Sequence, residues 1–310
     1  MSQGTAKKIY RGRFAPSPTG PLHIGSLIAA TGSYLQAKRH NGQWFVRIED
    51  IDPPRETKGA SDNIIKTLDA FGFEWDGDIL YQSTRLAAYE EIIQTLIANE
   101  QAYFCHCSRK QINEHADIGV NGPIYPRTCL HKKIQHHKYP QTAALRFHTH
   151  DENICFNDFT QASICQNVAR ESGDFVIKRA DGLYNYQLAV VIDDAYQDIT
   201  EVVRGSDLLF LTQGQINLQQ ALNYPTPDYL HMPVITNEHG QKLSKQTKAM
   251  AIEGTQGSQA LWLCLKFLGQ QPPEELKNDS IKNFWQWAIP NWNPQKIPHR
   301  LSIPANPGVT

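Results

Sequence analysis

The feature that most constrains the fold is a strand, a proline-rich loop, a helix and a second strand in immediate succession. The first predicted strand is "KIYRGRFAP", and Pro16 and Pro18 end it. A helix is predicted from about Leu22 to His40, before a turn at Asn41 and Gly42, and "QWFVRIED" follows as a buried strand. This order is typical of a βαβ unit, so the sequence predicts an α/β fold built on a parallel sheet.

Later segments extend this pattern and interrupt it once. Apolar residues spaced as in a helix run from Leu86 to Ile97, but from Cys105 to about Arg170 the periodicity breaks down, which indicates an insertion. Strands are then predicted at "GDFVIKR", "YQLAVVIDD", "ITEVVRG" and "HMPVIT", with a helix around Leu208 to Leu222. We therefore expect a first half of a catalytic domain at 1–100, an insertion at 101–172, a second half at 173–248 and a short helical region at 249–310.

Charge and composition argue against a globally basic protein, a secreted protein and a membrane protein. Lys and Arg number 30 against 31 Asp and Glu, so a nucleic-acid partner would have to bind a local basic patch. The run "HKKIQHHK" from His131 is one such patch, with a solvated charged surface as the alternative. The sequence contains neither a secretion signal nor an apolar run of about 18 residues, so we expect a soluble cytoplasmic protein with no membrane partner.

The loop "RFAPSPTGPLHIG" leads directly into the first predicted helix. A helix N-terminus carries unpaired N–H groups and partial positive charge, which together favour an anion such as phosphate. Gly20 and Gly25 leave room for a nucleotide, and His23 could donate to a phosphate oxygen. The alternative is a proline-rich turn that Ser17 or Thr19 only caps.

A second loop, "GQKLSKQTK", has two lysines three residues apart. Lys242 and Lys245 flank Ser244 after a glycine, so the loop could close over a triphosphate and place Lys245 on the charge that develops as pyrophosphate leaves. The alternative is a solvated basic loop.

The two loops together resemble the HIGH and KMSKS signatures of class I aminoacyl-tRNA synthetases. "VRIEDIDPPRE", "YQSTRLAAY", "GDFVIKRADGLYNYQLAVVIDD" and "EVVRGSDLL" narrow the resemblance to the glutamyl-tRNA synthetases, over about Arg11 to Lys248. The resemblance implies a Rossmann-type catalytic domain. Two positions differ: Ser26 takes the fourth place of HIGH and Gln246 the last place of KMSKS.

The residues at the predicted strand ends suit a dicarboxylic amino acid. Arg13 and Arg204 offer guanidinium groups for carboxylates, Glu49 could hold an ammonium group, and Tyr186 supplies a hydroxyl. As alternatives, Glu49 could be a solvated acid at a strand end, and Arg204 could pair with Asp207. The resemblance implies a glutamate site at Arg13, Phe14, Ala15, Pro16, Ser17, Glu49, Tyr186 and Arg204.

The implied chemistry is adenylation followed by acyl transfer, with His23 and Lys245 as catalytic residues. ATP, accompanied by Mg²⁺, would be bound by His23, Gly25, Lys242, Ser244 and Lys245. A glutamate carboxylate attacks the α-phosphate, and an acceptor hydroxyl then attacks the mixed anhydride. No side-chain nucleophile is needed, so catalysis would rest on positioning and electrostatics.

The insertion brings three of the six cysteines together. Cys105 and Cys107 form a C-x-C pair, and Cys129 follows later; three thiolates and one more ligand can close a tetrahedral zinc site. Tyr125, His106, His115 and His131 are candidates for the fourth position, and plain burial of the cysteines is the alternative. The resemblance implies one structural zinc ion with Tyr125 as the fourth ligand. Cys155, Cys165 and Cys264 are expected to be packing residues.

The short region after Lys248 suggests a subfamily. A glutamyl-tRNA synthetase continues with a large anticodon-binding region, whereas this tail contains one apolar helix, "QALWLCLKFLG", and three tryptophans that could stack on bases or seal the helix onto the body. This combination resembles the glutamyl-Q tRNA(Asp) synthetases, which attach glutamate to the queuosine base in the anticodon loop of tRNA(Asp).

That resemblance implies ATP, L-glutamate and the anticodon stem-loop of tRNA(Asp) as partners of a monomeric enzyme. Three alternatives remain open at this stage. They are a minimal glutamyl-tRNA synthetase that charges the tRNA 3′ end, a different HIGH-type ligase, and a catalytically silent RNA-binding protein.

Overall fold

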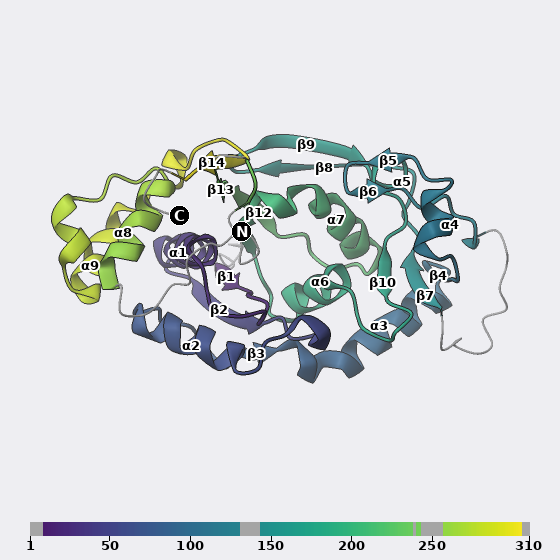
Figure 1. The fold of residues 1–310 in the computed structure, drawn as a ribbon, viewed down its shortest axis with the longest axis horizontal. Helices are drawn as coiled ribbons and strands as arrows, with labels where there is room; N and C mark the ends of the chain where they lie inside the picture. Colours follow the sequence, from purple (N-terminus) through teal and green to yellow (C-terminus); the bar gives the residue numbers. More distant parts are fainter. Residues whose placement is uncertain (1–8, 131–142, 238–239, 243–256, 306–310) are drawn as a thin grey trace, which may run out of the picture.

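The computed structural model describes residues 9–130, 143–237, 240–242 and 257–305. Figure 1 shows helix α1 (Ile24–Arg39) beside the first sheet, with helices α8 (Gly257–Phe267) and α9 (Ile281–Asn291) at one end of an elongated molecule. Strand β4 (Ala102–Cys105) lies near the opposite end. Within these described residues, no helix has both the length and the apolar character needed to cross a membrane.

The predicted βαβ unit is confirmed. Strand β1 (Arg11–Phe14) pairs in parallel with β2 (Gln43–Ile48), and β2 pairs in parallel with β3 (Leu80–Tyr81). Helix α1 makes the crossover and is buried along most of its length, because it packs against β1 and against the C-terminal helix α8. A parallel sheet covered by helices exposes the carboxyl ends of its strands as the place for a ligand.

A second sheet continues this architecture in the order β11, β12, β8, β9. Strands β11 (Glu201–Gly205), β12 (Asp228–Met232) and β8 (Asn153–Asp158) run parallel, and β9 (Ala162–Asn167) returns antiparallel to β8. The backbone N–H of Thr200 donates to the carbonyl of Arg11, which joins the first strands of the two sheets. The fold is therefore α/β with parallel strands, as the sequence predicts.

The range 101–172 does not fold as one separate sheet. Strand β4 pairs antiparallel with β7 (Ala144–Phe147), which also pairs with β10 (Val176–Lys178) from beyond this range, whereas β8 and β9 join β12. The division of the chain at residues 100, 172 and 248 stays a prediction.

Further elements connect these sheets and helices. They are β5 (Ile118–Gly119), β6 (Gly122–Pro123), α2 (Ala60–Ala70), α3 (Leu86–Ala98), α4 (Arg109–Asn113), α5 (Val168–Glu171), α7 (Thr212–Ala221) and the 3₁₀ helices Pro53–Arg55, Gln82–Arg85, Ser206–Leu211, Glu274–Asn278 and Pro294–Lys296.

Two predicted strands are wrong in type or extent. "YQLAVVIDD" forms helix α6 (Tyr186–Tyr196), whose start is capped by the Asn185 side chain accepting from the N–H of Gln187. Periodicity does not distinguish a strand from a helix in a short buried apolar run. The N-cap residue Asn185 is the local signal that favours the helix here. "HMPVIT" contains two strands, because Pro233 ends β12 before β13 (Val234–Thr236) pairs with β14 (Ser302–Pro304).

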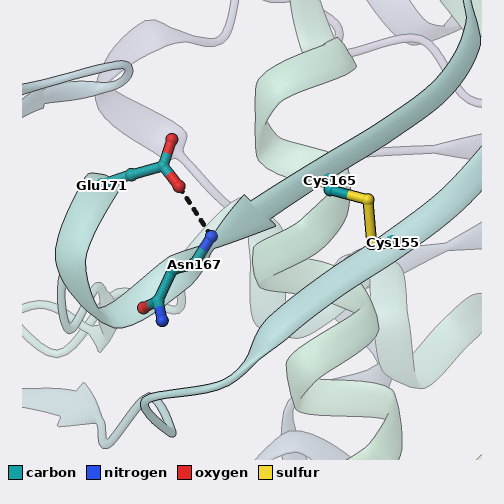
Figure 2. The surroundings of a disulfide bond; sticks show 4 residues. All are labelled: Cys155, Cys165, Asn167 and Glu171. Atoms are coloured by element: carbon teal, nitrogen blue, oxygen red, sulfur yellow. Dashed lines mark hydrogen bonds between the residues drawn. A yellow bond between two sulfur atoms is a disulfide. The ribbon is translucent and has the colours of Figure 1, made fainter.

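A disulfide corrects the prediction that Cys155 and Cys165 are packing residues. The two face each other across the β8–β9 ladder with Cα atoms 4.0 Å apart, and their sulfurs are bonded (Figure 2). Both side chains lie on the exposed face of the hairpin, and Figure 2 shows the Asn167 N–H donating to Glu171 where the hairpin passes into α5. The periodicity of the strands hides this pairing, because only their register places the two cysteines opposite each other.

The C-terminal tryptophans seal helix α9 onto the body, which was one of the two predicted alternatives. The indole N–H of Trp285 donates to the carbonyl of Phe71, and that of Trp292 donates to Gln36 on α1. Both rings are buried in a core that also contains Tyr34 and Leu261. Buried Trp side chains are usually hydrogen-bonded in this way, so these two are structural.

Candidate active site

A cavity of about 640 Å³ lies at the carboxyl ends of the parallel strands. It is bounded by the loop after β1, the start of α1, the end of β2, the start of α6 and the ends of β11 and β12. The sequence-predicted residues that line it are Arg13, Phe14, Ala15, Pro16, Ser17, His23, Gly25, Glu49, Tyr186, Arg204 and Lys242. Ser244 and Lys245, predicted for the nucleotide and for catalysis, lie outside the described residues, as does the basic run from His131.

The loop after β1 is fixed by backbone hydrogen bonds. Glu49 N–H donates to the carbonyl of Pro16 at 3.0 Å, and Thr57 N–H donates to that of Pro18 at 2.9 Å. Gly20 adopts a φ of 134°, a backbone conformation that strongly favours glycine. These contacts hold the loop across the end of β2, so its backbone forms one wall of the cavity.

A buried network of ion pairs lies behind Arg13, which lines the cavity together with Glu49 and Arg204; we call this part of the cavity its inner end. Arg13 donates to Asp194 through Nε (3.0 Å) and Nη2 (3.3 Å), and Arg47 Nη2 lies 2.8 Å from the same carboxylate. Burial alone would raise the pKa of Asp194, but the two guanidinium groups outweigh it and lower that pKa. The network therefore holds Arg13 rigidly where it reaches the cavity.

Sequence reasoning missed Arg47 and Asp194 as parts of this site. Asp194 lies on α6, beside Asp193, in the run that was predicted as a strand. Two adjacent acids inside an apolar run require buried partners, and that requirement is the signal that would have indicated an ion-pair network.

Glu49 combines burial with a place on the cavity wall. Its residue is 8% exposed, and a carboxylate oxygen lies 3.8 Å from Arg47 Nη2. Burial raises the pKa of Glu49 to about 7, more than the attraction of Arg47 and Arg13 lowers it. The alternative of a solvated strand-end acid is therefore wrong for Glu49. A bound ammonium group would compensate the buried charge of its ionised form.

Arg204, at the end of β11, lines the same cavity as Glu49. Its guanidinium donates through Nε to His231 (2.9 Å) and through Nη2 to the Thr212 hydroxyl (2.8 Å), and Nη1 lies 3.5 Å from the Tyr186 hydroxyl. Asp207 instead accepts from Lys242 at 2.6 Å. The alternative in which Arg204 pairs with Asp207 is therefore wrong.

The outer end of the cavity contains the start of α1. His23 is the N-cap of this helix: its Nδ1 accepts from the N–H of Ser26 at 3.2 Å, and Nε2 lies 3.3 Å from the Ser26 hydroxyl. The cap of the helix is therefore His23, and a role of Ser17 or Thr19 in capping the turn before it stays a prediction. With Nδ1 accepting, the neutral imidazole carries its proton on Nε2, the nitrogen suited to donate to a phosphate oxygen.

Cys105, Cys107 and Cys129 lie in a cluster that takes no part in lining the cavity. The Sγ atoms of Cys105, Cys107 and Cys129 all lie within 4.8 Å of one another. The Tyr125 hydroxyl lies 3.4 Å from Cys107 Sγ and accepts from the N–H of Cys129. His106 and His115 are not members of this group, and His131 lies outside the described residues.

The distances in the cluster suit a tetrahedral zinc ion. Zinc–thiolate bonds of about 2.3 Å place two sulfur ligands about 3.8 Å apart. The Cys107 and Cys129 sulfurs lie 3.5 Å apart, and the side chains of Cys105, Tyr125 and Cys129 are buried. Three soft ligands and one phenol oxygen converge on one point, which fits a structural ion.

Comparison with known proteins gives consistent results. The model of the catalytic domain of class I tRNA synthetases (E and Q) matches residues 10–265. A glutamyl-Q tRNA(Asp) synthetase from Chromobacterium violaceum is 46% identical over 94% of this chain and 96% of its own length. Proteins of that name are 46% identical in Neisseria meningitidis serogroup B (96% of this chain, 100% of the relative) and 48% identical in Dechloromonas aromatica (95% and 97%).

The solved structures support the fold. A glutamate-tRNA synthetase from Elizabethkingia anophelis superimposes with a TM-score of 0.76 at 22% identity, over 97% of this chain and 68% of that one. A glutamate tRNA ligase from Elizabethkingia meningosepticum gives 0.74 at 23% identity, over 94% and 66%. Both structures continue beyond the part that this chain matches.

Proposed function

This chain belongs to the class I tRNA synthetases (E and Q), a family of ligases, and from that premise we propose that it transfers glutamate to queuosine in the anticodon loop of tRNA(Asp). The observation that carries the proposal is that this chain matches the glutamyl-Q tRNA(Asp) synthetases over nearly their whole length as well as in sequence. Relatives named glutamyl-Q tRNA(Asp) synthetase are 45–48% identical and are covered over 94–100% of their own length. The two matched glutamate-specific synthetases with solved structures are longer than this chain.

The cavity supports activation of L-glutamate with ATP. The buried Arg13 and Arg204 offer positive charge for two carboxylates, and Glu49, which lines the same cavity, offers negative charge for the ammonium group. An oxygen of the glutamate α-carboxylate attacks the α-phosphorus of ATP, and the bond to pyrophosphate breaks. The resulting glutamyl-adenylate is a mixed anhydride, held with its leaving group at the outer end.

The outer end supplies charge to the phosphates. The N-terminus of α1 and His23 Nε2 face this part of the cavity, and Lys242 reaches it from the second loop. We assign Ser244 and Lys245 to the same role. Mg²⁺ bound to ATP would neutralise further phosphate charge. In the second step an acceptor hydroxyl attacks the glutamyl carbonyl, AMP leaves, and an ester bond forms.

The experiment that tests this function is transfer of labelled glutamate, with ATP, to purified tRNA. We expect label on tRNA(Asp) from cells that make queuosine and none on tRNA(Asp) from cells that lack it. Label on tRNA(Glu), whatever its queuosine content, would replace the proposal with a minimal glutamyl-tRNA synthetase. Absence of both transfer and glutamate-dependent pyrophosphate exchange would leave a catalytically silent protein.

We also assign one structural zinc ion to Cys105, Cys107, Tyr125 and Cys129. We expect about one zinc per chain by mass spectrometry of digested protein, and a Cys107→Ser variant should lose most of it because a thiolate ligand is removed. Cys264→Ser is the matched control, since this buried cysteine lies in the core beside α1. Equal zinc content in both variants would contradict the assignment.

The remaining assignments follow from the substrates. Since ATP and tRNA are cytoplasmic, we place the enzyme in the cytoplasm and assign the anticodon stem-loop of tRNA(Asp) as its RNA partner. We expect a monomer, which sedimentation equilibrium at several protein concentrations would test. We divide the chain into a catalytic domain at 1–100 and 173–248, an insertion at 101–172 and a helical region at 249–310.

A further inference from the structure

Three neighbouring parallel strands place a cation, a histidine and a carboxylate in one row behind the cavity. Arg204 on β11 is the register partner of His231 on β12, and Asp158 ends the next strand, β8. His231 Nδ1 lies 2.6 Å from Asp158 Oδ2, and Arg204 Nε donates to His231 Nε2 at 2.9 Å. The row is dry, because the side chains of His231 and Asp158 are both 0% exposed.

The partners on either side fix the protonation of the imidazole. An ionised carboxylate can only accept, so Nδ1 carries the proton toward Asp158; a guanidinium can only donate, so Nε2 must accept from Arg204. A second proton on His231 would face the guanidinium of Arg204. Burial and Arg204 lower the pKa of His231 to about 4, although Asp158 opposes this. The ring is therefore neutral near pH 7.

Further contacts hold the ring and the carboxylate in place. The ring of His231 stacks on that of Tyr229, with centroids 6.0 Å apart and planes 10° from parallel. Asp158 Oδ1 accepts from the N–H and hydroxyl of Thr160 and from the N–H of Gln161, and Oδ2 accepts from the N–H of His231. Asp158 thereby fixes both the turn after β8 and the tautomer of His231.

We propose that His231, oriented by Asp158, is a positioning residue that aims the guanidinium of Arg204 at a carboxylate of the bound amino acid. With Nε held by His231 and Nη2 by Thr212, the guanidinium cannot rotate, and its Nη1 edge stays beside Tyr186 on the cavity wall. Because the accepting imidazole is neutral, the positive charge of Arg204 is left for the ligand. This inference rests on the proposed activation of glutamate and deepens it.

The test compares substitutions of His231 that keep or remove the acceptor. His231→Leu removes it, and leaves Arg204 Nε buried without a partner; the side-chain oxygen of His231→Gln can still accept. In glutamate-dependent pyrophosphate exchange with total tRNA present, we expect His231→Leu to raise the KM for glutamate about 10- to 100-fold. The KM for ATP should stay within about twofold, and His231→Gln should recover most of the loss.

Asp158→Asn tests the tautomer separately. The amide oxygen, in the place of Oδ1, still accepts from Thr160 and can accept from the N–H of His231, which lies 3.3 Å from Oδ1. The NH₂ donates to Nδ1 and forces the imidazole proton onto Nε2, against Arg204. The same exchange of a carboxylate for an amide beside an imidazole costs a serine protease about 10⁴-fold in kcat, because there the imidazole is itself the general base. Here the imidazole only positions Arg204, so we expect the KM for glutamate to rise about as much as in His231→Leu, since both variants lose the same hydrogen bond.

Controls separate positioning from stability. Ser258→Ala on α8 loses the hydrogen bonds from a buried hydroxyl to the carbonyls of Lys277 and Asp279, away from the cavity, so its KM for glutamate should match the wild type. The inference is overturned if His231→Leu and His231→Gln behave alike, or if both KM values rise together. If His231→Leu does not fold, the comparison of His231→Gln with Asp158→Asn decides. Wild-type protein without exchange would overturn the proposed function itself.

Discussion

The two ends of the cavity differ in how deeply their charged side chains are buried. At the inner end, Arg13, Arg47 and Asp194 form ion pairs whose side chains are at most 8% exposed. At the outer end, the pair of Lys242 and Asp207 is 45% and 34% exposed, and His23 acts through the start of a helix. Buried charges are costly unless every partner is present, whereas exposed pairs contribute little. The inner end, to which we assign the amino acid, is therefore rigid before substrate binds, and the described part of the outer end relies on backbone dipoles and solvated charge.

The largest expected effect comes from removing the shared carboxylate of the inner end. Asp194→Ala leaves Arg47, whose side chain is 0% exposed, and Arg13 without their common partner. We expect the free energy of unfolding to fall by about 3–5 kcal/mol. Urea unfolding measures it.

Asp207→Ala is the matched change at the outer end, because it also removes an aspartate from an ion pair. We expect a loss of about 0–1 kcal/mol, since solvent screens this exposed pair. Equal losses in the two variants would remove the distinction between the two ends.

The second-largest effect concerns pH. Titration of Glu49 should make the stability of the fold fall and the affinity for glutamate rise as the pH increases. Its pKa is about 7 in the folded protein against an ordinary value of 4.5, so the folded state binds the extra proton. Its contribution to stability is present below about pH 4.5 and is lost as the pH rises through about 7. Glutamate binding should strengthen over the same rise, because only ionised Glu49 attracts the ammonium group.

Glu49→Gln isolates these trends. We expect the variant to lose less stability than the wild type between about pH 5 and pH 8, measured by urea unfolding, and calorimetry should show weak glutamate binding with little pH dependence. Parallel pH profiles in the two proteins would show that Glu49 does not titrate in this window.

Sequence reasoning named residues at both ends of the cavity, but it missed the partners that hold the inner ones in place. The loop before α1 could be predicted because proline, glycine and the following helix mark it locally. Arg47 and Asp194 could not, because their pairing joins β2 to α6, segments far apart in the sequence. His231 and Asp158 meet through strand order, and Cys155 meets Cys165 through register, which composition and periodicity do not reveal. Local motifs predicted residues that line the cavity, but not the long-range contacts that hold their side chains.

The smallest effect on stability is expected from a substitution of Lys242, which tests whether the outer end of the cavity acts separately from the inner end. Lys242→Met removes an exposed charge beside Asp207, so the free energy of unfolding should stay within about 0.5 kcal/mol of the wild type. Because the charge lines the outer end of the cavity, the KM for ATP should rise a few-fold in pyrophosphate exchange, while the KM for glutamate stays unchanged. Lys266→Met is the control, since this lysine lies over Trp262 on α8 and takes no part in lining the cavity. A rise in the KM for glutamate in Lys242→Met would mean that charge at the outer end also orients the amino acid, and the two ends would then act as one unit.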